Sequence, residues 1–325
     1  MTRIEVLVAL LCVVLVCAIA VPVGQAQRRS VYTVDCQANL GQIAQTAAKY
    51  GAVYDDWIVG SPNTSGAYLL NASIAYGPAV QVWEFMGVLQ FCWDGVSPPP
   101  PGNVQAVIDR FNMLRGDGVF RCPQNSFQAT HFTGPNAGTG PMISYNTSRM
   151  QMWYKELPNG IPGLTVPSSS SDEALPVGRA PRVSTMGQPQ RKVFCADGAR
   201  YSTSTFAPDY DLSVRATSGG AFSDSPPYDS FSRSWDRSWA NGNSTGIDAR
   251  IYGFRHSIGN PPPGAPGNAY RLNVAFYDGH VETQGDLDAS NPQQWLPMNT
   301  VLRTVNCWAD TQAYFSLPRH VVIGP

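Results

Sequence analysis

Three side chains near the end of the sequence could do chemistry: His256, Asp278 and His280. Two imidazoles and a carboxylate can bind a transition metal, or they can act together in acid–base catalysis. A tight turn formed by Asp278-Gly279 also explains the aspartate, and His280 follows it by only two residues. The pattern favours a structural hydrogen bond between His256 and this hairpin, and we predict neither a catalytic residue nor a metal site.

Seven cysteines are the next reactive side chains. Cys12 and Cys17 stand in an apolar stretch, where we expect small packing residues. An exported domain would meet oxidising conditions that favour disulfides among the other cysteines. Those other cysteines are Cys36, Cys92, Cys122, Cys195 and Cys307. Because five is an odd number, at least one stays free or pairs elsewhere, and no Cys-x-x-Cys occurs to indicate a zinc knuckle or a redox pair.

The composition limits the class of protein. The chain has 325 residues, of which 43% are apolar and 14% are charged, and its net charge is -1. This balance excludes a mostly disordered chain, and without a basic excess we expect no nucleic-acid partner. Gly-x-Ser-x-Gly, Walker and His-Glu-x-x-His sequences are absent, and only four histidines are present. We therefore predict a protein that is not an enzyme and takes no cofactor.

The N-terminal segment contains a long apolar run that precedes the rest of the chain. Residues 6–23 are all apolar, and no charge stands between Glu5 and Arg28. At about 1.5 Å per residue, such a helix nearly crosses the ~30 Å hydrocarbon core of a membrane. The run could instead be a signal peptide cleaved after Ala26, or a helix buried in a protein core. A signal peptide gains nothing from Glu5 or Pro22, so the sequence favours a membrane-spanning helix.

Helical spacing continues past the apolar run. The apolar residues that recur on one helical face are Cys36, Leu40, Ile43 and Ala47. This spacing is typical of an amphipathic helix with one buried stripe. We predict one long helix over residues 1–50, spanning a membrane over 6–23, bending near Pro22 and packing its second half on the body.

Short strands and turns are expected over residues 51–325. Leu272, Val274 and Phe276 alternate with other side chains, and Asp-Gly then separates this run from a second one, which predicts a hairpin. Val193 to Gly198 repeats the pattern with another Asp-Gly turn. The predicted fold class is α+β, with the long helix packed on an antiparallel sheet. Inserted loops are expected at about 160–185 and 201–250.

Several stretches resemble one family. Met1-Thr2-Arg3-Ile4-Glu5 and the apolar run resemble the mature N-terminus of type IV pilins and type II secretion pseudopilins, which carry a glutamate fifth and often a proline at position 22. Cys36 to Ile43 resembles the Cys-x-x-Asn-Leu-x-Gln-Ile stretch of a prepilin-like group common in planctomycete-type bacteria. Phe120 to Pro123 resembles its central Phe-x-Cys-Pro element. The His256 and Asp278-Gly279-His280 signature resembles its C-terminal His…Asp-Gly, with wider spacing.

The resemblance implies a structural subunit of a type II secretion or type IV pilus-like filament. It would be a single-pass protein of the inner membrane, with its C-terminal domain in the periplasm or outside the cell. Partners would be inner-membrane lipid and copies of itself or other pseudopilins, with Glu5 pairing with a neighbour's terminal amine. Met1 stands where the mature Phe would be, so prepilin peptidase would act only if a leader precedes it. The alternative is a secreted carbohydrate-binding or hydrolytic protein with a cleaved signal peptide.

Overall fold

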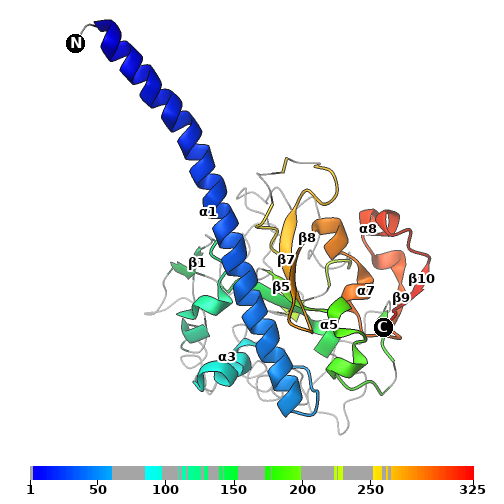
Figure 1. Cartoon of the computed structure of the whole chain (residues 1–325). Coiled ribbons are helices and arrows are strands. Elements are labelled where there is room, and N and C mark those ends of the chain that lie inside the picture. The colour runs from blue at the N-terminus through cyan, green and yellow to red at the C-terminus, as the bar shows by residue number, and fades with distance from the viewer. Residues whose placement is uncertain are drawn as a thin grey trace.

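The computed structural model shows a long N-terminal helix that projects from a body of strands and short helices (Figure 1). The body lies beside the C-terminal half of this helix, while the N-terminal half extends away from it. The structure describes residues 3–60, 85–96, 109, 112–114, 116–125, 128–130, 139–141, 143–152, 173–176, 178–198, 223–224, 226–229, 252–257, 261–262 and 265–325.

The projecting helix is α1 (Arg3–Val53), and it continues without interruption through Pro22. Among the described residues, it is the single helix that is long and apolar enough to cross a membrane. The most apolar window of 18 residues in α1 buries nothing against the rest of the chain. Leu7, Leu11 and Ile19 are each more than 60% exposed. An N-terminal membrane anchor and a signal sequence both have this character.

The second half of α1 belongs to the protein core. The four residues predicted to form one helical stripe, Cys36, Leu40, Ile43 and Ala47, are all buried. Between them, side chains such as Gln42 and Gln45 face the solvent. The stripe prediction is therefore confirmed. Within the described residues, the N-terminal half of α1 is therefore exposed, and its C-terminal half is held by packing against the body.

A five-stranded sheet with the order β6-β3-β5-β7-β8 forms the centre of the body. Its strands are β3 (Tyr145–Ser148), β5 (Val193–Asp197), β6 (Ser223–Asp224), β7 (Arg271–Phe276) and β8 (Val281–Gly285). Neighbouring strands are antiparallel, except that β3 and β6 are parallel. Together, the long helix and the antiparallel pairs make a mixed helix and strand fold that is compatible with the α+β class.

Smaller elements surround the central sheet. One additional sheet pairs β1 (Gln128–Thr130) with β2 (Thr139–Pro141), and another joins β10 (His320–Val322), β9 (Val301–Arg303) and β4 (Glu173–Ala174). The short α-helices are α3 (Met86–Asp94), α5 (Arg149–Met152), α6 (Asp286–Ala289), α7 (Pro292–Trp295) and α8 (Ala309–Tyr314). The 3-10 turns are η1 (Gly118–Phe120), η2 (Val183–Thr185), η3 (Pro189–Arg191) and η5 (Thr304–Asn306).

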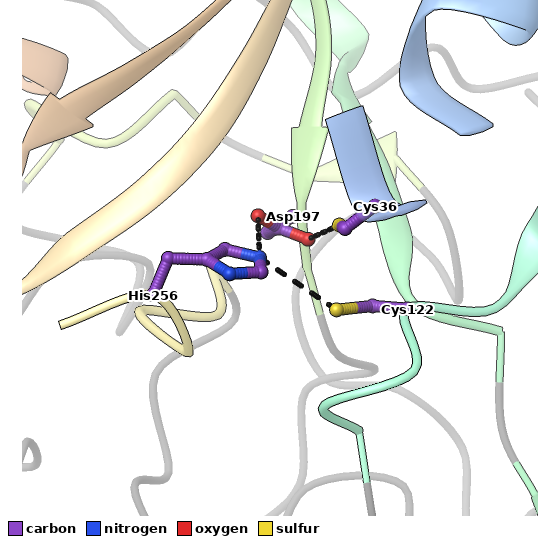
Figure 2. A group of neighbouring side chains, drawn as sticks. All are labelled: Cys36, Cys122, Asp197 and His256. Carbon is purple, nitrogen blue, oxygen red and sulfur yellow. Dashed lines mark hydrogen bonds and ion pairs between the residues drawn. The ribbon is translucent and has the colours of Figure 1, made fainter. Parts of the chain in front are cut away.

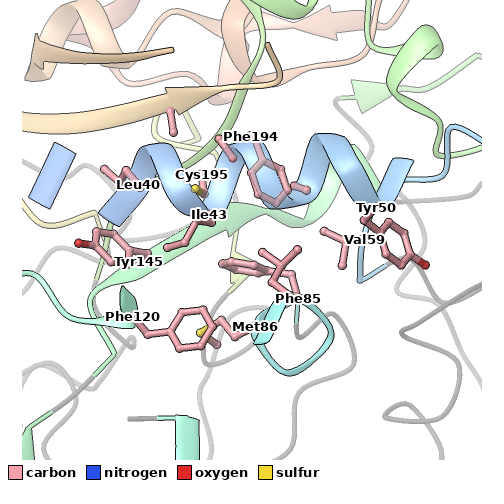
Figure 3. Packing of buried hydrophobic residues seen from close by; sticks show 14 of the residues in the cluster. Leu40, Ile43, Tyr50, Val59, Phe85, Met86, Phe120, Tyr145, Phe194 and Cys195 are labelled. Carbon is pink, nitrogen blue, oxygen red and sulfur yellow. The ribbon is translucent and has the colours of Figure 1, made fainter. Parts of the chain in front are cut away.

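Both faces of the central sheet are buried, because β5 and β7 each send side chains to both faces. Phe194 and Ala275 join a helix-side cluster, in which buried residues of α1 meet residues of α3, η1 and β3 (Figure 3). Val193 and Val274 point to an opposite cluster that contains Trp295. The sheet therefore lies between α1 on one side and the C-terminal elements on the other, and this places the end of β5 deep inside the protein.

The predicted hairpin is confirmed, since β7 and β8 pair in register from Arg271 opposite Gly285 to Ala275 opposite Val281. Its loop covers residues 277–280, with Gly279 at a φ of 92° that favours glycine. The second Asp-Gly turn was predicted wrongly. Gly198 forms a bridge with Tyr252 instead, and it directly follows the last residue of β5.

The predicted loops were placed only in part. Residues 160–172 and most of 201–250 lie outside the described residues. Within the first of these ranges, Glu173–Ala174 forms strand β4 against β9, and Val183–Thr185 forms the turn η2. Within the second, Ser223–Asp224 forms strand β6 against β3. These segments therefore contribute strands as well as loops.

Candidate metal centre

Four potential metal ligands meet beside the end of β5 (Figure 2). Cys36 comes from α1, Cys122 from the segment after η1, Asp197 from the last position of β5, and His256 from the segment before β7. Their ligand atoms, two thiol sulfurs, a carboxylate oxygen and an imidazole nitrogen, all lie within 4.8 Å of one another. Each of the four residues is buried.

Asp197 is the centre of this group. Its Oδ2 lies 3.0 Å from His256 Nε2 and accepts a 2.7 Å hydrogen bond from the backbone amide of Asn273. Its Oδ1 accepts a 3.0 Å hydrogen bond from the Cys36 thiol and lies 3.7 Å from Arg255 Nη1. A fully buried carboxylate is costly unless such partners satisfy it, and here both oxygens are satisfied.

Local backbone structure holds the segments that carry His256 and Asp197. The amide of His256 donates to the carbonyl of Arg271, which holds the histidine segment against β7. Gly198 follows Asp197 without room for a side chain, because a Cβ there would lie 2.5 Å from the side chain of Asn146. The close approach of β3 to β5 at this point therefore requires glycine.

The environment of His256 sets its tautomer. Thr33 Oγ1 lies 3.1 Å from His256 Nδ1 and itself donates a 2.9 Å hydrogen bond to the carbonyl of Arg29. Because the hydroxyl proton of Thr33 is already donated to Arg29, the Thr33 oxygen acts as an acceptor, and His256 Nδ1 donates its proton to it. In the neutral ring, Nε2 then carries a lone pair, and it faces Asp197 and, at 3.6 Å, the sulfur of Cys122.

Burial and charge shift the pKa values of the group in opposite directions. Burial raises the pKa of Cys36. The pKa of Cys122 is lowered to about 6, because its interactions with the Cys36 side chain and with His256 outweigh the effect of burial. Burial opposes ionisation of both members of the Asp197–His256 pair, but their mutual attraction outweighs it. The pKa of Asp197 is lowered and that of His256 is raised to about 10.

The arrangement suits ligand binding better than nucleophilic catalysis. In a Cys–His–Asp catalytic group, the cysteine and the carboxylate contact different ring nitrogens. Here Cys122 and Asp197 both face Nε2 of His256, and Thr33 occupies Nδ1. The side chains of Asp197 and His256 have no exposed surface, so a substrate has no access to them. Thiolate, imidazole and carboxylate are all ligands of zinc.

The predicted hydrogen bond between His256 and the hairpin is present, but it is made by the backbone of the histidine. Its backbone contacts β7 of the hairpin, yet its side chain contacts Asp197 rather than the turn at 278–280. Asp278 and His280 contact each other on the surface, with Oδ1 and Nδ1 2.5 Å apart, and the ring of His280 stacks on Phe276. The histidine side chain therefore belongs to a group at the end of β5, and Asp278 and His280 are not part of that group.

Two of the seven cysteines belong to the candidate centre and five do not, a division that the sequence did not indicate. All seven are free in the structure, and Cys36 and Cys122 are the two that meet. Cys195 is buried in β5, Cys307 is buried in the opposite cluster, and Cys92 is exposed on α3. The chain therefore offers buried cysteines both inside and outside the candidate centre.

The assembly residues predicted from the sequence lie at the far end of α1. Glu5 is exposed in its first turn, and Pro22 lies within the helix at the end of the apolar run. Met1 lies outside the described residues. These positions are remote from the four ligands. The described residues thus contain two separate features to explain: an apolar helical segment that is exposed, and a buried group of ligands.

Comparison of the chain with models of protein families, with curated proteins and with solved structures finds no match. The observations define a mixed helix and strand protein with one candidate membrane helix. Sequence reasoning missed Asp197 as a functional residue, because an aspartate before glycine is the ordinary sign of a turn. The sequence did carry a usable signal. Three of the four stretches that resemble the prepilin-like group each contain one residue of the centre, namely Cys36, Cys122 or His256.

Proposed function

We propose that this chain is a membrane-anchored structural subunit, similar to a pilin or pseudopilin, that assembles through α1 and has no catalytic role. The observation that carries the proposal is the division of α1 into two halves. Residues 6–23 bury nothing in this chain, whereas the stripe from Cys36 to Ala47 is buried in the body. A helix of this kind joins an apolar environment to a folded domain without a flexible linker.

The energy of burial supports a permanent apolar environment for the first half. The exposed large apolar side chains between Ile4 and Val23 number 13. Burying each one contributes roughly 1.5 kcal/mol or more, so the run contributes on the order of 20 kcal/mol when it enters lipid or a bundle of helices. The length of the run, about 30 Å for its 20 residues at 1.5 Å per residue, matches the hydrocarbon core of a membrane.

The carboxylate of Glu5 would favour assembly of this helix with neighbouring copies. It lies in the first turn of α1, directly before the apolar run. A carboxylate at the edge of hydrocarbon is stabilised by a cation, and the terminal amine of a neighbouring copy would supply one. Family resemblance assigns the same role to a glutamate at this position. The expected partners are thus inner-membrane lipid and copies of this chain or related pseudopilins.

The continuity of α1 favours retention of the segment over cleavage. Residue 26, the expected end of a signal peptide, lies within the helix, ten residues before Cys36 enters the core. Cleavage there would remove the apolar half and leave a secreted body, which would then have to be tested for carbohydrate binding or hydrolysis. The membrane-anchor and signal-peptide hypotheses therefore predict different first residues for the mature chain.

The test is the intact mass and the N-terminal sequence of the native protein from fractionated cells. A chain in the membrane fraction that retains residues 6–23 supports the anchor. A soluble chain that begins near Gln27 overturns it. Processing by prepilin peptidase, if a leader precedes Met1, would add N-methylation of the first residue.

Assembly needs a second measurement. Cross-linking in membranes should give ladders of this chain, and Glu5→Gln should reduce them strongly. Glu282→Gln is the matched control, because Glu282 is an exposed glutamate on the body, with its side chain 52% exposed. Equal ladders for both variants would contradict the role of Glu5.

A further inference from the structure

We propose that Cys36, Cys122, Asp197 and His256 bind one Zn²⁺ ion that fastens α1 to three separate segments of the body. The proposal goes beyond the assembly function and does not rest on it. The four ligands come from α1, from the segment after η1, from the end of β5 and from the segment before β7. A single ion would therefore join parts of the chain that are far apart in sequence.

The distances fit a tetrahedral ion with small adjustments. With Zn–S near 2.3 Å and Zn–N near 2.05 Å, tetrahedral geometry separates a sulfur and a nitrogen ligand by about 3.6 Å. Cys122 Sγ and His256 Nε2 are 3.6 Å apart. A sulfur–oxygen pair should be about 3.6 Å apart, and Cys36 Sγ and Asp197 Oδ1 are 3.0 Å apart. Loss of the shared protons and an outward shift of about half an ångström would admit the ion.

Hydrogen bonds from residues that are not ligands orient two of the four ligand side chains, and we call these contacts the second layer. Thr33 accepts the Nδ1 proton of His256, so that Nε2 faces the other three ligand atoms and can bind the ion once it loses its own proton. Histidine ligands in zinc sites usually have such a partner on the other ring nitrogen. The amide of Asn273 similarly holds Asp197 Oδ2. These contacts fix the orientation of two ligands before any ion is bound.

The charges balance when the ion is present. Two thiolates and one carboxylate carry three negative charges, and Zn²⁺ offsets two of them. Arg255 supplies the remaining positive charge, with Nη1 3.7 Å from Asp197 Oδ1 and further bonds to the carbonyls of Ser144 and Gly198. A neutral site is favourable in a buried position. Any protons still held by the two sulfurs and by His256 Nε2 are released to solvent when the metal binds.

The donor set indicates both the metal and its role. Two thiolates disfavour Mg²⁺ and Ca²⁺, which prefer oxygen ligands, and the mixture of sulfur, nitrogen and oxygen suits zinc. Four protein ligands complete a tetrahedron, so no position remains for water or substrate. The site would therefore be structural: it would hold the helix on the body rather than perform a reaction.

The test uses the full chain in detergent, purified with thiols kept reduced. Metal analysis should find about one zinc per chain, and a chelator should remove it and lower the melting temperature. Addition of zinc chloride alone should restore both. Substitution with Co²⁺ should give a thiolate-to-cobalt charge-transfer band and the visible bands of a tetrahedral ion. Absence of zinc and of these bands would overturn the proposal.

Matched variants separate this site from adventitious binding. Cys122→Ala and His256→Asn should lose the zinc, whereas Cys195→Ala and His280→Asn should keep it. Cys195 is a buried cysteine outside the group, and His280 is an exposed histidine beside two carboxylates. Equal zinc content in all four variants would overturn the assignment. If the ligand variants fail to fold, the cobalt spectrum of the unmodified chain still decides the matter.

Thr33→Val tests the second layer. The variant keeps all four ligands but removes the acceptor for His256 Nδ1, so zinc affinity should fall by about 10- to 100-fold. Thr46→Val is the control, since Thr46 is on the same helix and its hydroxyl bonds only the carbonyl of Gln42 among the described contacts. Unchanged zinc affinity in Thr33→Val would contradict the positioning role.

A disulfide is the rival outcome for the two cysteines. Alkylation of the native protein followed by mass measurement would show whether Cys36 and Cys122 are free. Two blocked sulfurs joined to each other in the freshly isolated protein would overturn the zinc site, because a disulfide lacks the thiolates that the ion requires. Protection of both thiols that ends when a chelator is added would support it.

Discussion

The thiol of Cys36 donates a hydrogen bond to Asp197 Oδ1 over 3.0 Å, which brings the N-terminal helix and the central strand β5 into direct polar contact. The residues that follow Cys36 on its helical face, Leu40 and Ile43, are fully buried in an apolar cluster. The polar contact therefore lies at the border between the exposed and the buried halves of α1.

Asp197→Ala should destabilise the chain even without metal. The substitution leaves His256, Arg255 and the amide of Asn273 without their shared partner in a buried position. Removing one member of a buried ion pair costs about 3–5 kcal/mol. Urea unfolding in the presence of a chelator measures this change. Glu282→Gln, on the surface, should stay within about 0.5 kcal/mol of the unmodified chain, and a similar loss in both variants would refute the prediction.

Leu40→Ala should loosen α1 from the body. Leu40 has no exposed surface and belongs to the helix-side cluster, so the substitution removes buried methyl groups and leaves a cavity. The expected loss of stability is about 2–5 kcal/mol by denaturant unfolding. Val34→Ala is the matched control on the same helix, because Val34 is 59% exposed and should change stability by less than about 0.5 kcal/mol.

Lys192→Met should release the C-terminal segment. The buried ammonium of Lys192 donates hydrogen bonds to three carbonyls, those of Gln293, Leu296 and Gly324, at 2.8, 3.1 and 2.9 Å. Methionine fills a similar volume but leaves these acceptors unsatisfied, at a cost of about 3 kcal/mol. Hydrogen exchange should show faster exchange near the C-terminus than in Lys49→Met, in which an exposed lysine is replaced. Equal exchange in the two variants would contradict this role.

Gly198→Ala should disturb the site without altering a ligand. The new Cβ would lie 2.5 Å from the side chain of Asn146, and the strand would have to move next to Asp197. Overpacking of this kind costs about 1–3 kcal/mol. Gly116→Ala is the control, because a Cβ there meets nothing within 4 Å. Thermal unfolding should therefore distinguish the two variants, and equal midpoints would show that β3 and β5 yield more easily than the packing indicates.

Local patterns in the sequence were enough to predict α1 and the β7–β8 hairpin. The apolar run and the spacing of Cys36, Leu40 and Ile43 both report on neighbours within a few turns of one helix. Asp278-Gly279 likewise specifies a turn between adjacent runs, since glycine permits the positive φ found at Gly279. The helix and the hairpin depend mainly on contacts between residues close in sequence.

Only the tertiary structure could decide that Cys36, Cys122, Asp197 and His256 form one group. From the sequence, disulfides were plausible for five of the cysteines, a hydrogen bond to the hairpin was expected for the histidine, and a turn was expected at Asp197; each expectation was locally reasonable. What brings them together is the packing of α1 against β5 and the pairing of β5 with β7, contacts between residues many tens of positions apart. Burial then gives these ordinary side chains their unusual pKa values, because charge is costly away from water and each group must rely on the others.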